Sequence, residues 1–313
     1  MVQAVVVGAL LLLLAWLAAN TIDNLRLRGI TVGFDFLSRE ARFSISDTVL
    51  PYSPADTFAW AFLVGLCNTL FLSAIVAVAS TLLGFCVALG RRSSHPLSNL
   101  ISTIFVDTVR NIPVLVLLLF VYSLIIFELP DPVTARVWHG FFLNNRGFYG
   151  PALSWIGSGL HWSFPHMGHF NIDGGWIVSP ELAAAVAGLT IYSTAFSAEI
   201  IRGGIDAVYK GQWEAGRALG LADKQVLRLV ILPQALRVIV PPMTSQYVII
   251  VKNSTLALMV GYAEINFVTS TTINQTGQAV EGTAILMTVF LVISLMASWL
   301  MNILNRRYVL VEH

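Results

Sequence analysis

Lys252 is the residue of this sequence whose type and position most clearly suggest chemistry. It interrupts the apolar stretch Val238–Ala263, and Asn253 and Ser254 follow it directly. Charged side chains at membrane depth are costly, and they often mark a transport path. The ammonium group could bind a substrate carboxylate, or it could pair with an acidic residue on another helix. Gln246 lies on the same stretch and could line the same path.

Two further pairs of charged residues lie near the ends of apolar runs. Asp107 with Arg110, and Glu199 with Arg202, are spaced so that each pair can meet on one face of a helix. The simpler interpretation is that both are ion pairs whose long side chains reach the membrane interface. The alternative is that Glu199 and Arg110 face a substrate path.

Motifs for catalysis and for metal or nucleotide binding are missing from the sequence. His161, His166 and His169 follow a spacing that is unusual for zinc, and the two cysteines lie together in one apolar run. We find no His-Glu-x2-His, no Gly-x-Ser-x-Gly and no phosphate-binding Gly-x4-Gly-Lys-Ser/Thr. We therefore expect no catalytic residues, no metal site and no cofactor bound by this chain, and an intramembrane enzyme is disfavoured.

The composition indicates that most of the chain is surrounded by lipid. Of 313 residues, 56% are hydrophobic and only 11% are charged, whereas soluble domains carry roughly 25% charged residues. The net charge of +1 says nothing about nucleic acid, but the sequence has no basic stripe interleaved with aromatic residues, so we expect no nucleic-acid partner.

Six stretches are apolar and long enough to be candidate membrane helices. The fold expected is therefore an all-α, polytopic bundle with a five-helix core and one N-terminal span. The first stretch could instead be a signal peptide, but it lacks a basic beginning and a clear cleavage pattern, which favours a retained helix. The six stretches are Met1–Ile22, Thr57–Gly90, Asn111–Phe127, Leu182–Ala198, Val238–Ala263 and Gly282–Asn305.

Lysine and arginine residues predict the orientation of these helices. One side carries ten of them in short segments, and the longer segments of the other side carry six against eleven acidic residues. The more basic side is expected to be cytoplasmic, with both termini there. On the outside, Glu128–Glu181 is rich in Gly, Pro, Trp and His and is expected to be an aromatic interfacial loop, and Glu264–Glu281 a turn.

The cytoplasmic segment Gly211–Arg237 carries six charges in an otherwise apolar chain. Its pattern predicts two short helices that lie on the membrane surface. The first covers Ile205–Leu219 and ends at Gly220, Asp223 is the N-cap of the second, and Pro233 marks a kink or join. The segment could be a helix that only rests on the bilayer, a gate, or a helix that docks on a soluble partner. Small residues at Ala215, Gly216 and Ala218 favour docking, because they let two backbones approach closely.

The spacing of this segment resembles the EAA signature of ABC importer permeases, which is Glu-Ala-Ala, three residues, Gly, nine residues, Ile, one residue, Leu-Pro. Two positions differ mildly, because Gly216 stands for the second Ala and Val230 for Ile. The stretches Val109–Leu115, Glu199–Gln212 and Lys252–Glu264 are similar to the branch of the family that imports polar amino acids. The similarity covers roughly 65–308. The matching positions are Glu214, Ala215, Gly216, Gly220, Val230, Leu232 and Pro233.

The resemblance implies that this segment is a coupling helix. Glu214 would pair with a basic group on a cytoplasmic ATPase, Ala215 and Gly216 would form the close contact, and Gly220 would permit the turn. It further implies a dimer of ATP-binding subunits that carries ATP and Mg, a second permease subunit, a periplasmic substrate-binding protein and an L-amino-acid substrate at a bacterial inner membrane. A self-contained secondary carrier or channel for small polar solutes is the alternative.

We expect three parts along the chain. Residues 1–56 form an N-terminal span and a periplasmic segment. Residues 57–308 form the permease domain, with the long periplasmic segment 128–181 and the coupling loop 202–237. Residues 309–313 form a cytoplasmic tail.

Overall fold

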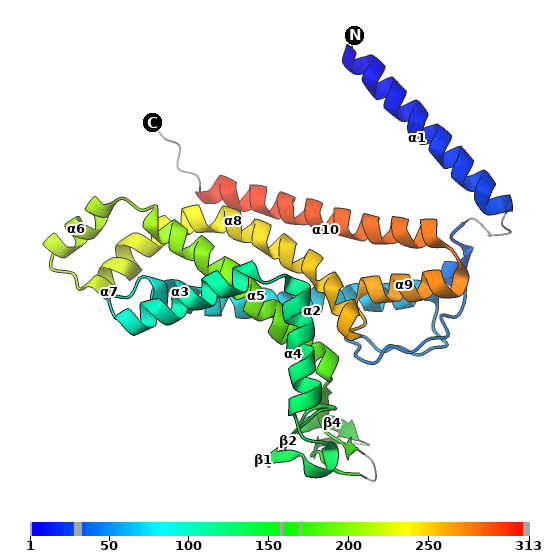
Figure 1. Cartoon of the computed structure of the whole chain (residues 1–313), viewed down its shortest axis with the longest axis horizontal. Helices are drawn as coiled ribbons and strands as arrows, with labels where there is room; N and C mark the ends of the chain where they lie inside the picture. Colours follow the sequence, from blue (N-terminus) through cyan, green and yellow to red (C-terminus); the bar gives the residue numbers. More distant parts are fainter. Residues whose placement is uncertain (1, 28–32, 157–158, 169–170, 309–313) are drawn as a thin grey trace.

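The computed structural model describes residues 2–27, 33–156, 159–168 and 171–308, so the predicted tail 309–313 and His169 lie outside the described residues. Most of the described chain is helical (Figure 1). The α-helices are α1 (Val2–Leu27), α2 (Phe58–Arg91), α3 (Pro96–Asn111), α4 (Val114–Glu128), α5 (Pro180–Asp206), α6 (Lys210–Ala218), α7 (Asp223–Val226), α8 (Leu232–Asn253), α9 (Ile265–Thr276) and α10 (Ala279–Tyr308). Short 3-10 helices are η1 (Asp35–Ser38), η2 (Pro132–Thr134) and η4 (Ser254–Val260), and η3 (Leu227–Ile231) is a π-helix.

Among the described residues, four helical units are long and apolar enough to cross a membrane, namely α2, α5, Asp223–Val260 and α10. Helices α3 and α4 together would make a fifth span, although they meet at 109°. The sequence predicted only Asn111–Phe127 there. The bend falls at Pro113, because proline lacks a backbone N–H and keeps the preceding residue extended.

Small residues let α2 and α5 pack closely. A Cβ atom at Gly84 of α2 would lie 2.8 Å from the Ser197 Cβ and 3.1 Å from the Ala198 backbone nitrogen on α5. Close approach of small residues is the usual way in which helices associate in lipid. Toward the α6–α7 end of the molecule, an apolar cluster joins α2, α3, α5, α7, η3 and α8, and its fully buried members are Ala88, Val106, Ala198, Ile205, Val226, Ile231 and Ala235.

Residues between α4 and α5 form β-structure, where the sequence predicted an aromatic loop (Figure 1). A four-stranded antiparallel sheet has the order β1-β2-β3-β8, and the pairs β4-β5 and β6-β7 are separate antiparallel hairpins. Aromatic residues stabilise the sheet: the rings of Phe141 and Phe148 stack 5.7 Å apart. The strands are two to five residues long, too short for a periodic pattern to be read. They are β1 (Arg136–Trp138), β2 (Phe141–Asn144), β3 (Gly147–Gly150), β4 (Ala152–Ile156), β5 (Gly159–Ser163), β6 (His166–Met167), β7 (Ile172–Asp173) and β8 (Trp176–Val178).

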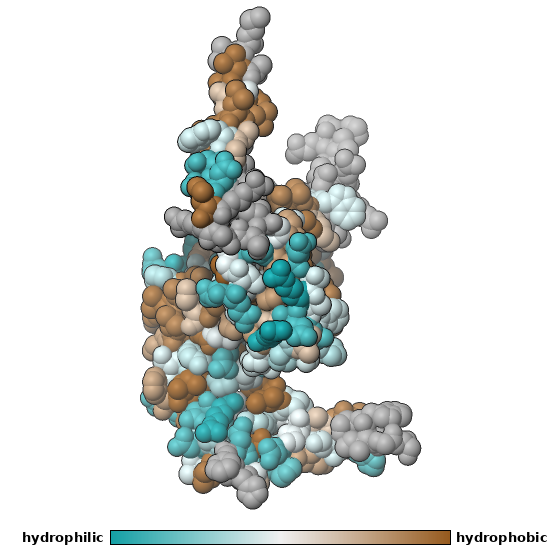
Figure 2. Space-filling model, turned by 90° about the vertical axis from the view of Figure 1, so that its right-hand side faces the viewer, coloured by the Kyte–Doolittle hydropathy of each residue, from teal (hydrophilic) through white to brown (hydrophobic). Residues whose placement is uncertain are grey.

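Helix α9 replaces the turn that the sequence predicted over Glu264–Glu281. The buried Glu264 side chain is its N-cap and accepts hydrogen bonds from the backbone N–H groups of Asn266 and Phe267 at 2.9 and 3.0 Å. Helix α9 lies at the right-hand end of Figure 1, which faces the viewer in Figure 2. There, hydrophilic residues gather at the centre of the face, with hydrophobic residues beside them (Figure 2).

Buried polar groups bind the segment before α2 to α2 and to the start of α5. The Asn68 amide of α2 donates to the backbone oxygens of Asp47 and Ala263 at 2.7 and 2.8 Å. The Ser179 hydroxyl, which caps α5, donates to the Asp47 carboxylate at 2.5 Å. Burial raises the pKa of the Asp47 carboxyl above its usual value, although the Ser179 hydrogen bond opposes that change.

Candidate functional site

The α6–α7 hairpin, residues Lys210–Val226, lies at one end of the molecule and joins α5 to the long unit that contains α8 (Figure 1). Helix α6 begins only at Lys210, because the chain leaves helical geometry at 207–209. The sequence predicted one continuous helix over Ile205–Leu219. The helices on both sides of the hairpin cross the bundle, so any displacement of the hairpin acts on two membrane-spanning units.

Gly220 makes the turn of the α6–α7 hairpin, as the sequence predicted. Its φ of +78° lies in the left-handed region, which residues with a Cβ atom rarely adopt. The backbone N–H of Gly220 donates to the Arg217 carbonyl at 2.9 Å, and the N–H of Leu221 donates to the Gly216 carbonyl at 3.2 Å. These bonds satisfy carbonyls that the end of α6 leaves free.

Gly216 lies on the inner face of the α6–α7 hairpin. It is buried, and a Cβ atom there would lie 2.9 Å from both methyl carbons of Val226, which is itself fully buried. The resemblance implied that Gly216 lies on the docking surface beside Ala215. The structure instead places its bare backbone against α7, where it sets how closely α6 and α7 approach.

Helix α6 carries two further predicted coupling residues, Glu214 and Ala215. Glu214, Ala215 and Ala218 are exposed, and the Leu219 side chain is 82% exposed at the tip. A charged residue, small residues and a projecting leucine thus form a surface that lacks the bulky apolar stripe of a helix lying in lipid. This surface suits contact with a partner backbone.

Asp223 is the first residue of α7, and it does not cap the helix as predicted. Its carboxylate pairs with Arg217 of α6 at 2.7 Å, and both side chains are largely exposed. The N-cap position is Ala222, whose backbone N–H donates to the Gln225 side chain at 2.9 Å. Exposed ion pairs contribute little free energy, so packing of Gly216 against Val226 is the stronger link between the two helices.

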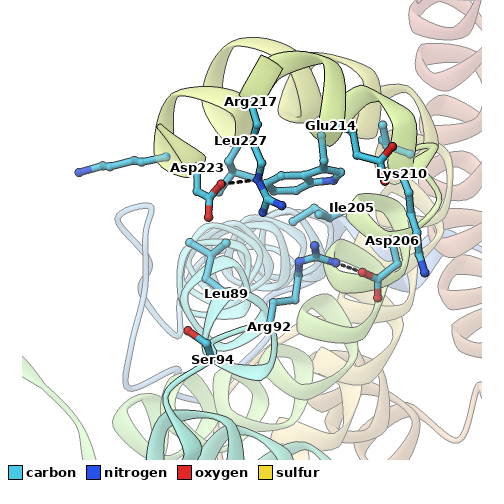
Figure 3. A pocket seen from close by; sticks show the side chains of 13 residues that line it. Leu89, Arg92, Ser94, Ile205, Asp206, Lys210, Glu214, Arg217, Asp223 and Leu227 are labelled. Carbon is cyan, nitrogen blue, oxygen red and sulfur yellow. Dashed lines mark hydrogen bonds and ion pairs between the residues drawn. The ribbon is translucent and has the colours of Figure 1, made fainter. Parts of the chain in front are cut away.

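A cavity of about 650 Å³ lies between part of the α6–α7 hairpin and the ends of α2 and α5 (Figure 3). Charged groups of both signs line it together with apolar side chains. Arg92 and Asp206 form an ion pair on its wall beneath the hairpin. The other charged residues that line the cavity are Lys210, Glu214, Arg217, Asp223 and Lys224.

Leu232 and Pro233 stand where the π-helix η3 becomes the α-helix α8. Leu232 is the first residue of α8 and is partly buried, and Pro233 is exposed within its first turn, where its missing N–H costs least. π-Helical turns are rare and are often found at functional sites. Pro233 therefore marks the join between the hairpin and the span, as the sequence predicted.

Glu199 is held in ion pairs at the hairpin end of the bundle. Its carboxylate binds Arg202 at 2.5 Å, which confirms the predicted pair, and it also binds Arg91 of α2 at 2.7 Å. The predicted pair of Asp107 with Arg110 is not formed. Asp107 lies 3.5 Å from Arg91, and Arg110 lies over the Phe196 ring at 5.3 Å.

The predicted substrate residues of α8 lie apart from that ion-pair group. No ion pair of the described residues includes Lys252, whereas Glu199 pairs with Arg202 and Arg91. Lys252 is exposed and Asn253 half-buried, whereas Gln246 and Ser254 are buried. The Ser254 hydroxyl donates to the Val251 carbonyl at 2.7 Å, so it is used within the helix. Glu199 and Arg110 therefore do not join Lys252 in one cluster.

Sequence reasoning missed Arg91 and Arg92 as members of the site. Both belong to the end of α2, far in sequence from their partners Glu199 and Asp206. The signal that could have identified them is their position as adjacent arginines that end an apolar helix, opposite acidic residues at the end of another.

The fold and this site define a polytopic membrane protein of the transport class. Residues 80–310 match the family described as "Binding-protein-dependent transport system inner membrane component", and the chain belongs to that family.

Similar proteins agree with this assignment. The chain is 40% identical to the "Putative amino-acid ABC transporter permease protein YhdX" of Escherichia coli K12, over 99% of this chain and 94% of that protein. It is 34% identical to the "General L-amino acid transport system permease protein AapQ" of Rhizobium johnstonii, over 95% of this chain and 88% of that protein. A solved "amino acid ABC transporter with histidines" is 27% identical and covers 80% of this chain and 95% of its own, with a TM-score of 0.60.

Proposed function

We propose that this chain is the transmembrane permease subunit of an ABC importer for L-amino acids, and that its α6–α7 hairpin receives the force of a separate ATPase. The observation that carries the proposal is the exposed Glu214-Ala215 surface, at the EAA spacing, on a hairpin that connects two spanning helices. In this reading the chain is a transport subunit and performs no catalysis itself.

The geometry of the hairpin supports a mechanical role. A rigid element that is continuous with α5 and with the α7–α8 unit passes a push directly to both, and packed helices respond by moving as bodies. The Glu214 carboxylate would pair with a basic group of the ATPase, and Ala215 and Ala218 would let the two backbones approach. Gly216 and Gly220 would hold the hairpin in shape.

The substrate class follows from the similar proteins, whose printed names specify amino acids. Every α-amino acid carries a carboxylate, and Lys252 offers an exposed ammonium group on a spanning helix. We propose Lys252 as the residue of this chain that meets the carboxylate, with Asn253 beside it. We no longer include Glu199 and Arg110 in the substrate path, because Glu199 is paired with Arg91 and Arg110 lies over the Phe196 ring.

The chain requires partners for this function. ATP and Mg²⁺ would be bound by a dimer of cytoplasmic ATPase subunits, since the sequence has no phosphate-binding loop. A second permease subunit would complete the path, and a periplasmic binding protein would deliver the amino acid. The hairpin would face the cytoplasm of a bacterial inner membrane, with both termini on the same side.

Charge reversal at Glu214 tests the proposal. The complex is purified in mild detergent, and both the ATPase retained and the ATP-driven uptake in proteoliposomes are measured. Glu214→Lys is expected to reduce both, because it places like charges together, whereas Glu128→Lys, an exposed charge reversal at the end of α4, should change neither.

Two results would overturn the proposal. One is a Glu214→Lys complex that keeps its ATPase and its uptake rate. The other is uptake by the chain alone, driven by an ion gradient without ATP, which would identify a secondary carrier.

A further inference from the structure

Arg92 connects three elements that meet beneath the α6–α7 hairpin. It follows directly after α2, its guanidinium pairs with Asp206 at the end of α5, and it lies over the Trp213 ring of α6 at 5.6 Å from the ring centre. Figure 3 shows the Arg92–Asp206 pair on the cavity wall below the hairpin.

The surroundings of Arg92 hold it in one place. Its side chain is 27% exposed, and Leu89 and Ile205 line the same cavity wall. Arg202, which pairs with Asp206 at 2.7 Å, fixes the carboxylate from the other side.

The neighbouring Arg91 binds different partners. It pairs with Glu199 of α5 and Asp107 of α3, so it ties α2 to the bundle. Apolar packing places Ala88 of α2 and Val226 of the hairpin in one cluster. Among the ion pairs and ring contacts of the described residues, the contact between Arg92 and Trp213 is the one that joins the end of α2 to α6. The peptide chain itself connects the hairpin only to α5 and to the unit that contains α8.

We propose that Arg92 is a positioning residue that carries displacement of the α6–α7 hairpin into α2, by holding Asp206 with the edge of its guanidinium and Trp213 with its face. The inference rests on the proposed coupling function of the hairpin, and it adds α2 as a third helix that the ATPase moves.

The chemistry of arginine makes this assignment specific. A planar guanidinium can donate in its plane to a carboxylate and at the same time stack its face on an aromatic ring. A lysine keeps the charge but offers a point charge on a flexible stem, so it satisfies one partner at a time. Arg92→Lys therefore keeps the positive charge but removes the simultaneous contact with Asp206 and Trp213.

The experiment uses the whole complex in proteoliposomes and measures amino acid transported per ATP hydrolysed. Arg92→Lys and Trp213→Leu are each expected to lower that ratio about fivefold or more, while ATPase retention in detergent and melting temperature stay at the wild-type level. Trp213→Phe keeps an aromatic face and is expected to keep most of the ratio. Arg237→Ala, which removes an exposed arginine without an ion pair among the described residues, is the matched control.

The double variant Arg92→Lys/Trp213→Leu decides whether the two residues act together. If the ratio of the double variant is no lower than that of the worse single variant, the proposal is supported. Each single variant would then already remove the same Arg92–Trp213 contact, which leaves nothing further to lose.

Three outcomes would overturn it: a wild-type ratio in Arg92→Lys, a Trp213→Phe variant as poor as Trp213→Leu, or uptake and ATP hydrolysis that fall in equal proportion as the complex falls apart. Failure of the proposed function itself is distinguishable, since the wild-type chain would then retain no ATPase.

Discussion

Adding one methyl group at Gly216 is expected to open the α6–α7 hairpin. The new Cβ would lie 2.9 Å from both methyl carbons of Val226, closer than carbon atoms pack. Val226 cannot turn away easily, because it is fully buried and β-branched side chains are stiff about their first torsion. The contact must therefore be relieved by moving α6 away from α7.

The magnitude follows from the cost of overpacking, about 1–3 kcal/mol of the free energy that keeps the hairpin closed. If the ATPase binds only the closed hairpin, its apparent affinity falls with the closed fraction, by up to about a hundredfold. Uptake should fall with it. Membrane insertion should not change, because Gly216 lies outside the apolar spans.

The assay compares ATPase affinity and uptake of the chain in nanodiscs and proteoliposomes for four variants. Gly216→Ala should be impaired. Gly203→Ala is the control, because a Cβ at that exposed α5 position meets no atom within 4 Å. Val226→Ala removes both crowded methyls, so Gly216→Ala/Val226→Ala should lose less than the sum of the two single losses.

The reasoning is refuted if Gly216→Ala binds the ATPase as the wild type does. It is equally refuted if the losses of the two single variants add without any rescue, since the predicted clash would then not exist.

Three other substitutions test the fold and the path. Gly84→Val should lower the melting temperature, because its side chain would strike the Ser197 Cβ and the α5 backbone, and unchanged stability would show that this crossing is loose. Because burial raises the pKa of Asp47 in the folded state, its stabilising contribution is present at low pH and is lost as pH rises through the raised value. Asp47→Asn should therefore gain melting temperature relative to the wild type as the pH rises above about 4. A relative loss of melting temperature over that rise would contradict the stated cause. Lys252→Met should raise the substrate concentration for half-maximal uptake about tenfold, equivalent to about 1.4 kcal/mol, and unchanged uptake kinetics would remove Lys252 from the path.

Four of the apolar spans, and the polar hairpin with its turn at Gly220, could be predicted from the sequence. Helices in lipid must satisfy their own backbone groups, so long apolar runs leave few alternatives. The break at Gly220 and the pair Glu199–Arg202 depend only on neighbours along the chain, and both predictions were correct. The role of Gly216 was not predictable, because it depends on Val226, ten residues further on and in the next helix.

Short elements and ion pairs between distant residues could not be predicted from the sequence. The strands between α4 and α5 contain two to five residues, which is too few for a period of two to be distinguished from a loop. The sequence did not predict helix α9, because Glu264 was interpreted as a charged residue of a turn. Only the structure shows that its side chain is buried and accepts hydrogen bonds from the backbone at the start of the helix. The sequence offered Arg110 as the partner of Asp107, but helix packing brought Arg91 to it and placed Arg110 over Phe196.

The sequence by itself determined that this is a membrane protein with a polar segment at the EAA spacing between two spans, because hydropathy and local spacing depend only on order along the chain. The tertiary structure alone decided what that segment touches. Gly216 packs against Val226, Glu214 and Ala215 are exposed, and Arg92 of a distant helix end lies under Trp213. Contacts between distant residues depend on how helices cross in space, and no local pattern of residues specifies that.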